Sequence, residues 1–235
     1  MEHDLVAGLK WYLVFLFSTS CHEAAHAWSA HRLGDDTAYR GGQVSLNPVP
    51  HVKREPLGMV VVPWLSYLLG GWMIGWASAP YSPQWAVRYP QRSAVMALAG
   101  PAANLTLVLC AAVLMRVGFE WGVFRRPIDG GFLSVVVASG DPEGIWAFCA
   151  NMLSLFFSLN LILGAFNLLP LPPLDGANVP LLFLPPAAAE KYWMALRQPV
   201  FSWIGLMLAW RLFGMVSPAL FQNASKLLYL TMPGG

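Results

Sequence analysis

The residues best suited to chemistry lie near the start of the chain, in the run H-E-A-A-H at positions 22–26. On a helix, a spacing of four residues places His22 and His26 on one face, where two ring nitrogens can share one metal ion. Glu23 lies beside the first imidazole and can take the proton of a zinc-bound water as general base. The run therefore predicts a catalytic Zn²⁺ site with His22 and His26 as ligands and Glu23 as the catalytic residue.

A catalytic zinc ion usually has three protein ligands and one open position, so a third ligand is needed. His31 is near the end of the same predicted helix, and His51 is in a polar loop. Asp175 is the better candidate, because it is the one acidic residue in a long apolar region and follows a proline-rich break. Unwound backbone at membrane depth lets a carboxylate turn inward. The alternative for Asp175 is an N-cap of the short segment that begins at Gly176.

The composition places these residues in a membrane protein. The 235-residue chain is 57% hydrophobic and 11% charged, whereas a soluble domain carries about 25% charged residues. Its apolar regions can supply most of the ~20 residues that cross a bilayer; they are 5–17, 57–79, 93–115, 146–186 and the region from 200 onward. We therefore expect a lipid bilayer around the chain. The net charge of +2 is too small to indicate nucleic acid as a partner.

The elements that must position the site are predicted to be helices. The first runs from Leu5 to Leu33 and stops at Gly34, and later helices cover 93–117, 144–169 and 199–230. The predicted fold class is an all-α polytopic membrane protein, a bundle of about 5–6 transmembrane or re-entrant segments. A short β element is expected after the first helix, at residues 43–46, where Asn47-Pro48 would end it.

Lysine and arginine in the loops set the expected orientation. The loop after the first helix and the loop before the third apolar region carry the positive residues Arg32, Arg40, Lys53, Arg54, Arg88 and Arg92. Because cytoplasmic loops are enriched in such residues, we expect both loops to be cytoplasmic. Residues 57–79 then cannot cross the membrane once; they must dip into it and return, which their prolines and glycines allow. This topology puts the active site nearer the cytoplasmic side.

Three motifs, in order along the chain, resemble the site-2 protease family of intramembrane metalloproteases. They are H-E-A-A-H at 22–26, G-P-A-A-N at 100–104 and N-L-L-P-L-P-P-L-D-G at 167–176. The last fits the family pattern N-x-x-P-x-P-x-L-D-G at every fixed position. Residues 31–35 and 45–48 are also similar to those of the small bacterial members. The resemblance implies that His22, His26 and Asp175 bind zinc and that Glu23 is catalytic.

The resemblance also implies a substrate and a location. The reaction would be hydrolysis of a peptide bond in or near a transmembrane segment of a membrane protein, as in regulated intramembrane proteolysis. Asn104 and Asn167 would be polar residues near the site that contact the substrate backbone. We expect the unwound substrate to extend beside the predicted strand, at Val44 and Ser45. The expected location is a bacterial inner membrane.

The spacing of the motifs indicates a small member of this family. We expect one membrane-embedded protease domain over residues 1–235, with its core at 5–176 and C-terminal helices at 177–235. Residues 105–166 are too few for the PDZ domain that some relatives insert there, and the residues after Asp175 leave no room for a CBS pair.

Other classes of protein can also carry an H-E-x-x-H motif. A different membrane metalloprotease would take its third ligand from an E-x-x-x-D arrangement, but Glu190 has no Asp four residues later. A metal-binding transporter should offer polar residues on several helices or paired repeats, and the sequence has neither pattern. A catalytically inactive membrane scaffold should have lost Glu23 or a ligand, and none is lost. These alternatives therefore rank below the protease.

Overall fold

The computed structural model describes residues 4–230, and helices account for most of them. The long helices are α1 (Leu5–Arg32), α6 (Pro90–Glu120), α7 (Ile145–Asn167) and α9 (Pro199–Leu230). Short helices connect them: α2 (Thr37–Arg40), α3 (Pro48–Arg54), η1 (Leu57–Val61), α4 (Val62–Gly70), α5 (Pro83–Arg88), η2 (Asp175–Leu182) and α8 (Pro186–Leu196). The predicted all-α class is confirmed, although the sequence did not predict α8.

Within residues 4–230, three helices are long and apolar enough to cross a membrane: α6, α7 and α9. Helix α1 has 28 residues, which is also enough to span a bilayer at 1.5 Å per residue, but it carries the H-E-A-A-H run and several serines. Much of α9 is exposed, as is normal for an apolar helix that lipid surrounds. The chain is therefore an integral membrane protein with several helical segments.

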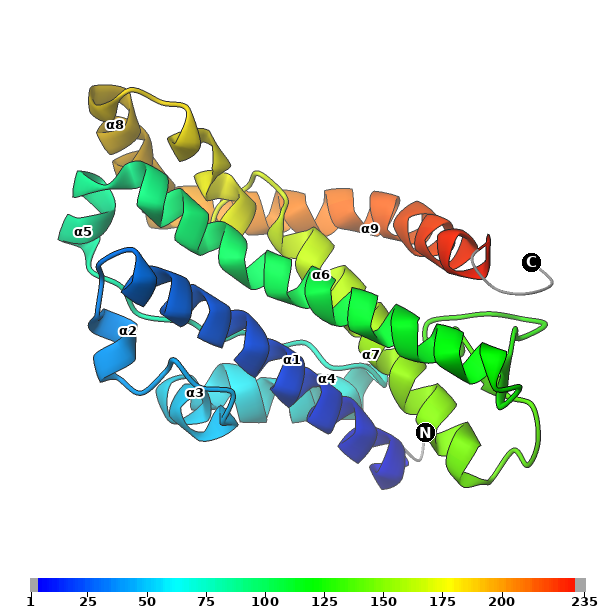
Figure 1. The fold of residues 1–235 in the computed structure, drawn as a ribbon. Coiled ribbons are helices and arrows are strands. Elements are labelled where there is room, and N and C mark those ends of the chain that lie inside the picture. Colours follow the sequence, from blue (N-terminus) through cyan, green and yellow to red (C-terminus); the bar gives the residue numbers. More distant parts are fainter. Residues whose placement is uncertain (1–3, 231–235) are drawn as a thin grey trace.

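Helix α6 holds the fold together, because it packs against α1, α7 and η2 (Figure 1). Helix α1 begins where the Asp4 side chain accepts a hydrogen bond from the Val6 amide at 2.8 Å, which satisfies one free donor of the first turn. It ends at Arg32, and Gly34 has a φ of 102°, a left-handed conformation that glycine adopts without strain. The predicted bounds of this helix agree to within one residue.

Residues 57–79 turn back on themselves, as the loop charges predict. Helices η1 and α4 lead away from α3, Gly71 makes the turn with a φ of 75°, and residues 72–82 return without helix. The Trp76 amide donates to the Gly58 carbonyl at 3.1 Å, and a Cβ on Gly58 would lie 2.2 Å from the Trp76 oxygen. Ser78 also hydrogen-bonds to Glu55. The two ends of this hairpin therefore lie side by side.

The predicted strand at residues 43–46 is wrong. These residues form bends between α2 and α3, where the Ser45 carbonyl accepts a hydrogen bond from His51 Nε2 at 3.0 Å and Asn47 caps α3. A strand needs a neighbouring strand to satisfy its backbone, and no other segment in residues 4–230 pairs with this one. The strands that the structure has are β1 (Phe124–Arg125) and β2 (Val137–Ala138), an antiparallel pair in the α6–α7 connection.

The hairpin can be tested by labelling single cysteines from each side of the membrane. In a background with Cys21, Cys110 and Cys149 replaced by Ala, Lys53→Cys and Gln84→Cys should react with a membrane-impermeant maleimide from the same side, because the intervening chain returns. Asp141→Cys, in the α6–α7 connection, should react from the opposite side and serves as the control. Labelling of Lys53→Cys and Gln84→Cys from opposite sides would refute the hairpin.

Candidate metal centre

Helix α1 brings the two histidines together at the centre of the fold. Their spacing puts both rings on one face of the helix, and the Nε2 atoms of His22 and His26 lie 3.0 Å apart. Asp175 completes the cluster, with its Oδ2 atom 3.1 Å from His22 Nε2 and 3.3 Å from His26 Nε2. Each residue offers one potential ligand atom, and all three atoms lie within 4.8 Å of one another. The structure thus juxtaposes the three residues that the sequence predicts as ligands.

Asp175 reaches the histidines because the chain folds back sharply after α7. This helix ends at Asn167, ahead of the prolines that cannot continue it. Gly176 then lies so close to the end of α7 that a Cβ there would be 2.2 Å from the Leu168 carbonyl oxygen. The Asp175 carboxylate points to the imidazoles, and among residues 4–230 no backbone amide donates to it. The side chain does not act as the alternative N-cap.

The outer nitrogens of both histidines already have partners. His26 Nδ1 lies 2.8 Å from the carbonyl oxygen of Met96, and His22 Nδ1 lies 2.5 Å from Oδ1 of Asn104. Both partners are oxygens that only accept hydrogen bonds, so each Nδ1 carries the ring proton. In a neutral imidazole the other nitrogen then has a free lone pair. Both Nε2 lone pairs therefore face each other and the Asp175 carboxylate.

This donor set fits a metal ion. Three electron-pair donors at such short range repel one another unless a cation or protons lie between them. Two ligands of a tetrahedral zinc ion, each 2.0–2.2 Å from it, are about 3.3–3.6 Å apart, and the cluster's spacings are only slightly shorter. Gly100 of α6 borders the same space, since a Cβ on it would lie 2.3 Å from His26 Nε2 and 2.5 Å from His22 Nε2. Two imidazoles and one carboxylate also match the ligands of catalytic zinc sites.

Glu23 follows His22 on α1 and is only 5% exposed. Within residues 4–230, its carboxylate has no hydrogen-bond or salt-bridge partner. A carboxylate without a hydrogen bond or salt bridge does little to hold the fold together, so this position favours a chemical role over a structural one. The arrangement offers one free carboxylate beside a site that can hold a cation.

The residues predicted to contact the substrate lie at different distances from the histidines. Asn104 is fully buried and contacts His22 directly. Asn167 instead donates its side-chain amide to the Leu163 carbonyl of its own helix at 2.9 Å. Val44 and Ser45 lie in the bend before α3, and no hydrogen bond links them to the histidines among the described residues. Only Asn104 is thus joined to the cluster.

The sequence analysis did not identify two residues that the structure brings to the site, Asn160 and Gly100. Asn160 of α7 accepts a hydrogen bond from Asn104 Nδ2 at 2.8 Å and donates to Ser18 of α1 at 2.9 Å. One signal could have found Asn160: it is a polar residue within a strongly apolar helix, two turns before Asn167 and therefore on the same face. Gly100 lies within the quoted G-P-A-A-N motif, but its contact with both imidazoles required the structure.

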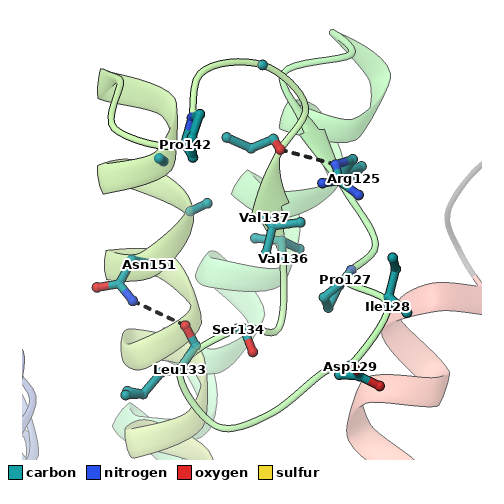
Figure 2. Close-up of a pocket in the computed structure, with 14 residues that line it drawn as sticks. Arg125, Pro127, Ile128, Asp129, Leu133, Ser134, Val136, Val137, Pro142 and Asn151 are labelled. Atoms are coloured by element: carbon teal, nitrogen blue, oxygen red, sulfur yellow. Dashed lines mark hydrogen bonds between the residues drawn. The ribbon is translucent and has the colours of Figure 1, made fainter.

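A separate pocket of about 590 Å³ lies in the α6–α7 connection (Figure 2). Val137 and Ile128 supply apolar lining, while Arg125, Asp129 and Asn151 supply polar groups. Asn151 donates to the Leu133 carbonyl and Arg125 to the Ala138 carbonyl, so two of these polar groups help to hold the loop. None of the residues that the sequence predicts for chemistry lines this pocket.

Comparison with known proteins identifies relatives that are described as putative zinc metalloproteases. "Putative zinc metalloprotease YwhC" from Bacillus subtilis is 33% identical over 186 residues, which are 77% of this chain and 72% of that protein. Proteins described as "Putative zinc metalloprotease Rip2" are 30% identical in Mycolicibacterium smegmatis and 31% identical in Mycobacterium tuberculosis. Each Rip2 alignment covers 69% of this chain and 52% of Rip2, so the chain spans about half the length of those relatives. No family model matches the chain, and no solved structure does.

The names of these relatives agree with the zinc metalloprotease family that the three motifs resemble. The identity to YwhC extends over most of both chains, so it is not confined to one short motif. The names of the relatives support a hydrolase that uses a metal, and the helices indicate that it lies in a membrane. The chain belongs to the site-2 protease family and is a membrane metalloprotease.

Proposed function

We propose that this protein is a zinc-dependent intramembrane endopeptidase that cleaves peptide bonds in or near the transmembrane segments of other membrane proteins. The observation that carries the proposal is the cluster of His22, His26 and Asp175, whose three ligand atoms lie within 4.8 Å at the centre of an apolar helical fold. Ionisable residues at such a depth are rare and usually functional. Glu23 lies beside them and has no hydrogen bond or salt bridge within residues 4–230, which supports hydrolysis over metal transport.

Each residue then has a defined role. His22, His26 and Asp175 would hold the ion, and Asn104 and the Met96 carbonyl orient the two imidazoles. A bound zinc ion supplies Lewis acidity, which lowers the pKa of water and polarises a carbonyl group. Glu23 accepts a proton from the attacking water and can return it to the leaving amine.

We place the site nearer the cytoplasmic side of the membrane. The Arg92 guanidinium donates to the Leu33 carbonyl at 3.1 Å, so the end of α1 and the start of α6 lie together at the end where the loop lysines and arginines gather. Such loops are usually cytoplasmic. At 1.5 Å per residue, His22 lies roughly 15 Å along α1 from that end and roughly 25 Å from the other end, at Leu5. A bacterial inner membrane remains our proposed location, since the relatives are bacterial.

The returning arm of the hairpin, residues 72–82, is the better candidate for binding an extended substrate than residues 43–46. Gly75 lies against Phe15 of α1, and the Ser82 amide donates to Asp35 just beyond the other end of that helix. Between these contacts the arm runs along α1 (Figure 1). In residues 4–230, the amides of Ala77 and Ala79 have no hydrogen-bond partner. Free backbone groups at membrane depth are costly, and an unwound substrate strand would satisfy them.

Glu23→Gln and Asp175→Ala should separate chemistry from metal binding. Glu23→Gln removes the base and leaves the proposed ligands in place, so zinc content should stay at the wild-type level while cleavage of a membrane-embedded reporter falls by about 10²-fold or more. Asp175→Ala should lower both, because one ligand is lost. Undiminished cleavage by Glu23→Gln would remove Glu23 from the mechanism, and full zinc occupancy in Asp175→Ala would remove Asp175 from the site.

Gly100→Ala should disturb the metal site through a single methyl group. Its Cβ would lie 2.3–2.5 Å from the two Nε2 atoms, so we expect zinc affinity to fall about tenfold or more, as for other changes that misplace metal ligands. The matched control is Gly214→Ala in α9, where no atom lies within 4 Å of the added carbon. Chelator competition on the two purified variants measures the effect. Equal affinities would show that the ion does not bind beside Gly100.

Ala77→Pro tests the returning arm as the substrate-binding edge. Proline removes one of the free amides, so cleavage of the reporter should fall while zinc content stays unchanged. Val44→Pro provides the comparison at the strand position that the sequence predicts. A loss of cleavage in Val44→Pro alone would return the binding edge to residues 43–46 and contradict our assignment.

A further inference from the structure

A line of buried hydrogen bonds runs from α7 through α6 to the metal centre on α1. Asn160 and Asn104 are both fully buried. Asn104 Nδ2 donates to Asn160 Oδ1 at 2.8 Å, and His22 Nδ1 donates to Asn104 Oδ1 at 2.5 Å. Buried amides of this kind are expensive unless every donor and acceptor is satisfied, so the direction of each hydrogen bond matters.

The direction of the whole line is set at its far end. Asn160 Nδ2 lies 2.8 Å from the carbonyl oxygen of Phe156 and 2.9 Å from the hydroxyl of Ser18. A backbone carbonyl can only accept a hydrogen bond, so the NH₂ group of Asn160 must be the one that faces it. The Oδ1 atom of Asn160 is thereby directed at Asn104.

The orientation of Asn160 fixes the orientation of the Asn104 amide, and that amide fixes the ring proton of His22. Because Asn160 presents an oxygen, Asn104 must present its NH₂ group to it, and this leaves the Asn104 oxygen facing His22. That oxygen accepts from Nδ1, so the ring proton of His22 lies on Nδ1 and Nε2 keeps its lone pair for a metal ion. If Asn104 were flipped, two amide oxygens would face each other and His22 would have to carry its proton on Nε2.

We propose that Asn160 is a positioning residue that acts through Asn104 to hold His22 in the tautomer able to bind the metal. The inference deepens the proposed function and rests on its metal site. Nothing in the geometry brings Asn160 into contact with the ligand atoms themselves, since its side chain is hydrogen-bonded to Asn104, Ser18 and Phe156. Asn160 orients the side-chain amide of Asn104, and this amide fixes the position of the ring proton of His22.

A double-mutant cycle on zinc affinity tests this relay. Chelator competition is carried out on the purified full-length wild type, on Asn104→Leu, on Asn160→Leu and on the double variant. Loss of such an outer partner typically weakens metal binding by about 10–100-fold, and we expect each single variant to fall in this range. Because Asn160 acts only through Asn104, the double variant should bind no more weakly than Asn104→Leu. Additive losses, or wild-type affinity in Asn160→Leu, would overturn the proposal.

Two further variants separate positioning from general packing. Ser158→Ala removes another buried hydrogen bond of α7, from the Ser158 hydroxyl to the Phe132 carbonyl, and should keep wild-type zinc affinity. Asn160→Asp keeps an oxygen acceptor for Asn104, and because burial favours the neutral carboxylic acid, its hydroxyl can still donate to the Phe156 carbonyl. This variant should restore most of the affinity that Asn160→Leu loses. A loss in Ser158→Ala equal to that in Asn160→Leu would show that Asn160 serves only the packing of α7.

The tautomer itself gives a readout that does not depend on activity. In zinc-free protein labelled with ¹⁵N-histidine, His22 should carry its proton on Nδ1 in the wild type and gain an Nε2–H signal in Asn160→Leu. An unchanged tautomer would contradict the relay even if zinc binding fell. If the wild type itself bound no zinc, the proposed function would fail, whereas zinc binding that is indifferent to Asn160 would defeat only this inference.

Discussion

The structure depends on burying three electron-pair donors in the middle of an apolar helical fold. His22, His26 and Asp175 face one another from two segments that are distant in the sequence, and nothing apolar could replace them without losing the cluster. The free-energy cost of burying these polar groups is limited because the outer nitrogen of each imidazole has a fixed acceptor. What remains unsatisfied is confined to the inner side, where a cation can neutralise it.

Close backbone contacts make this arrangement possible. Gly100 lets α6 approach both imidazoles, and Gly176 lets the chain after α7 return against the end of that helix. In the hairpin, Gly58 lies against the carbonyl of Trp76. A Cβ at each of these glycines would collide with a backbone oxygen or with a hydrogen-bonded imidazole, so the small residues define distances between elements. The site is as much a product of these contacts as of its polar residues.

The helices and the motif were predictable because both rest on local patterns. The bounds of α1 follow from its apolar length and from Gly34 just beyond its end. The four-residue spacing of His22 and His26 needs only a helix. The strand at residues 43–46 was wrong for the opposite reason. A strand is stabilised by a partner elsewhere in the chain, and its local composition does not show whether that partner exists.

The sequence by itself determined the chemistry on offer: a histidine pair, an adjacent glutamate, an isolated aspartate after a proline break, and apolar helices to hold them. Only the tertiary structure decided how these groups relate. It directs the Asp175 carboxylate at the imidazoles, places the returning arm at residues 72–82 against α1, and joins Asn160 to His22 through Asn104. The physical reason is that hydrogen-bond direction and close approach depend on three-dimensional distances between α1, α6 and α7, which spacing along the chain does not encode.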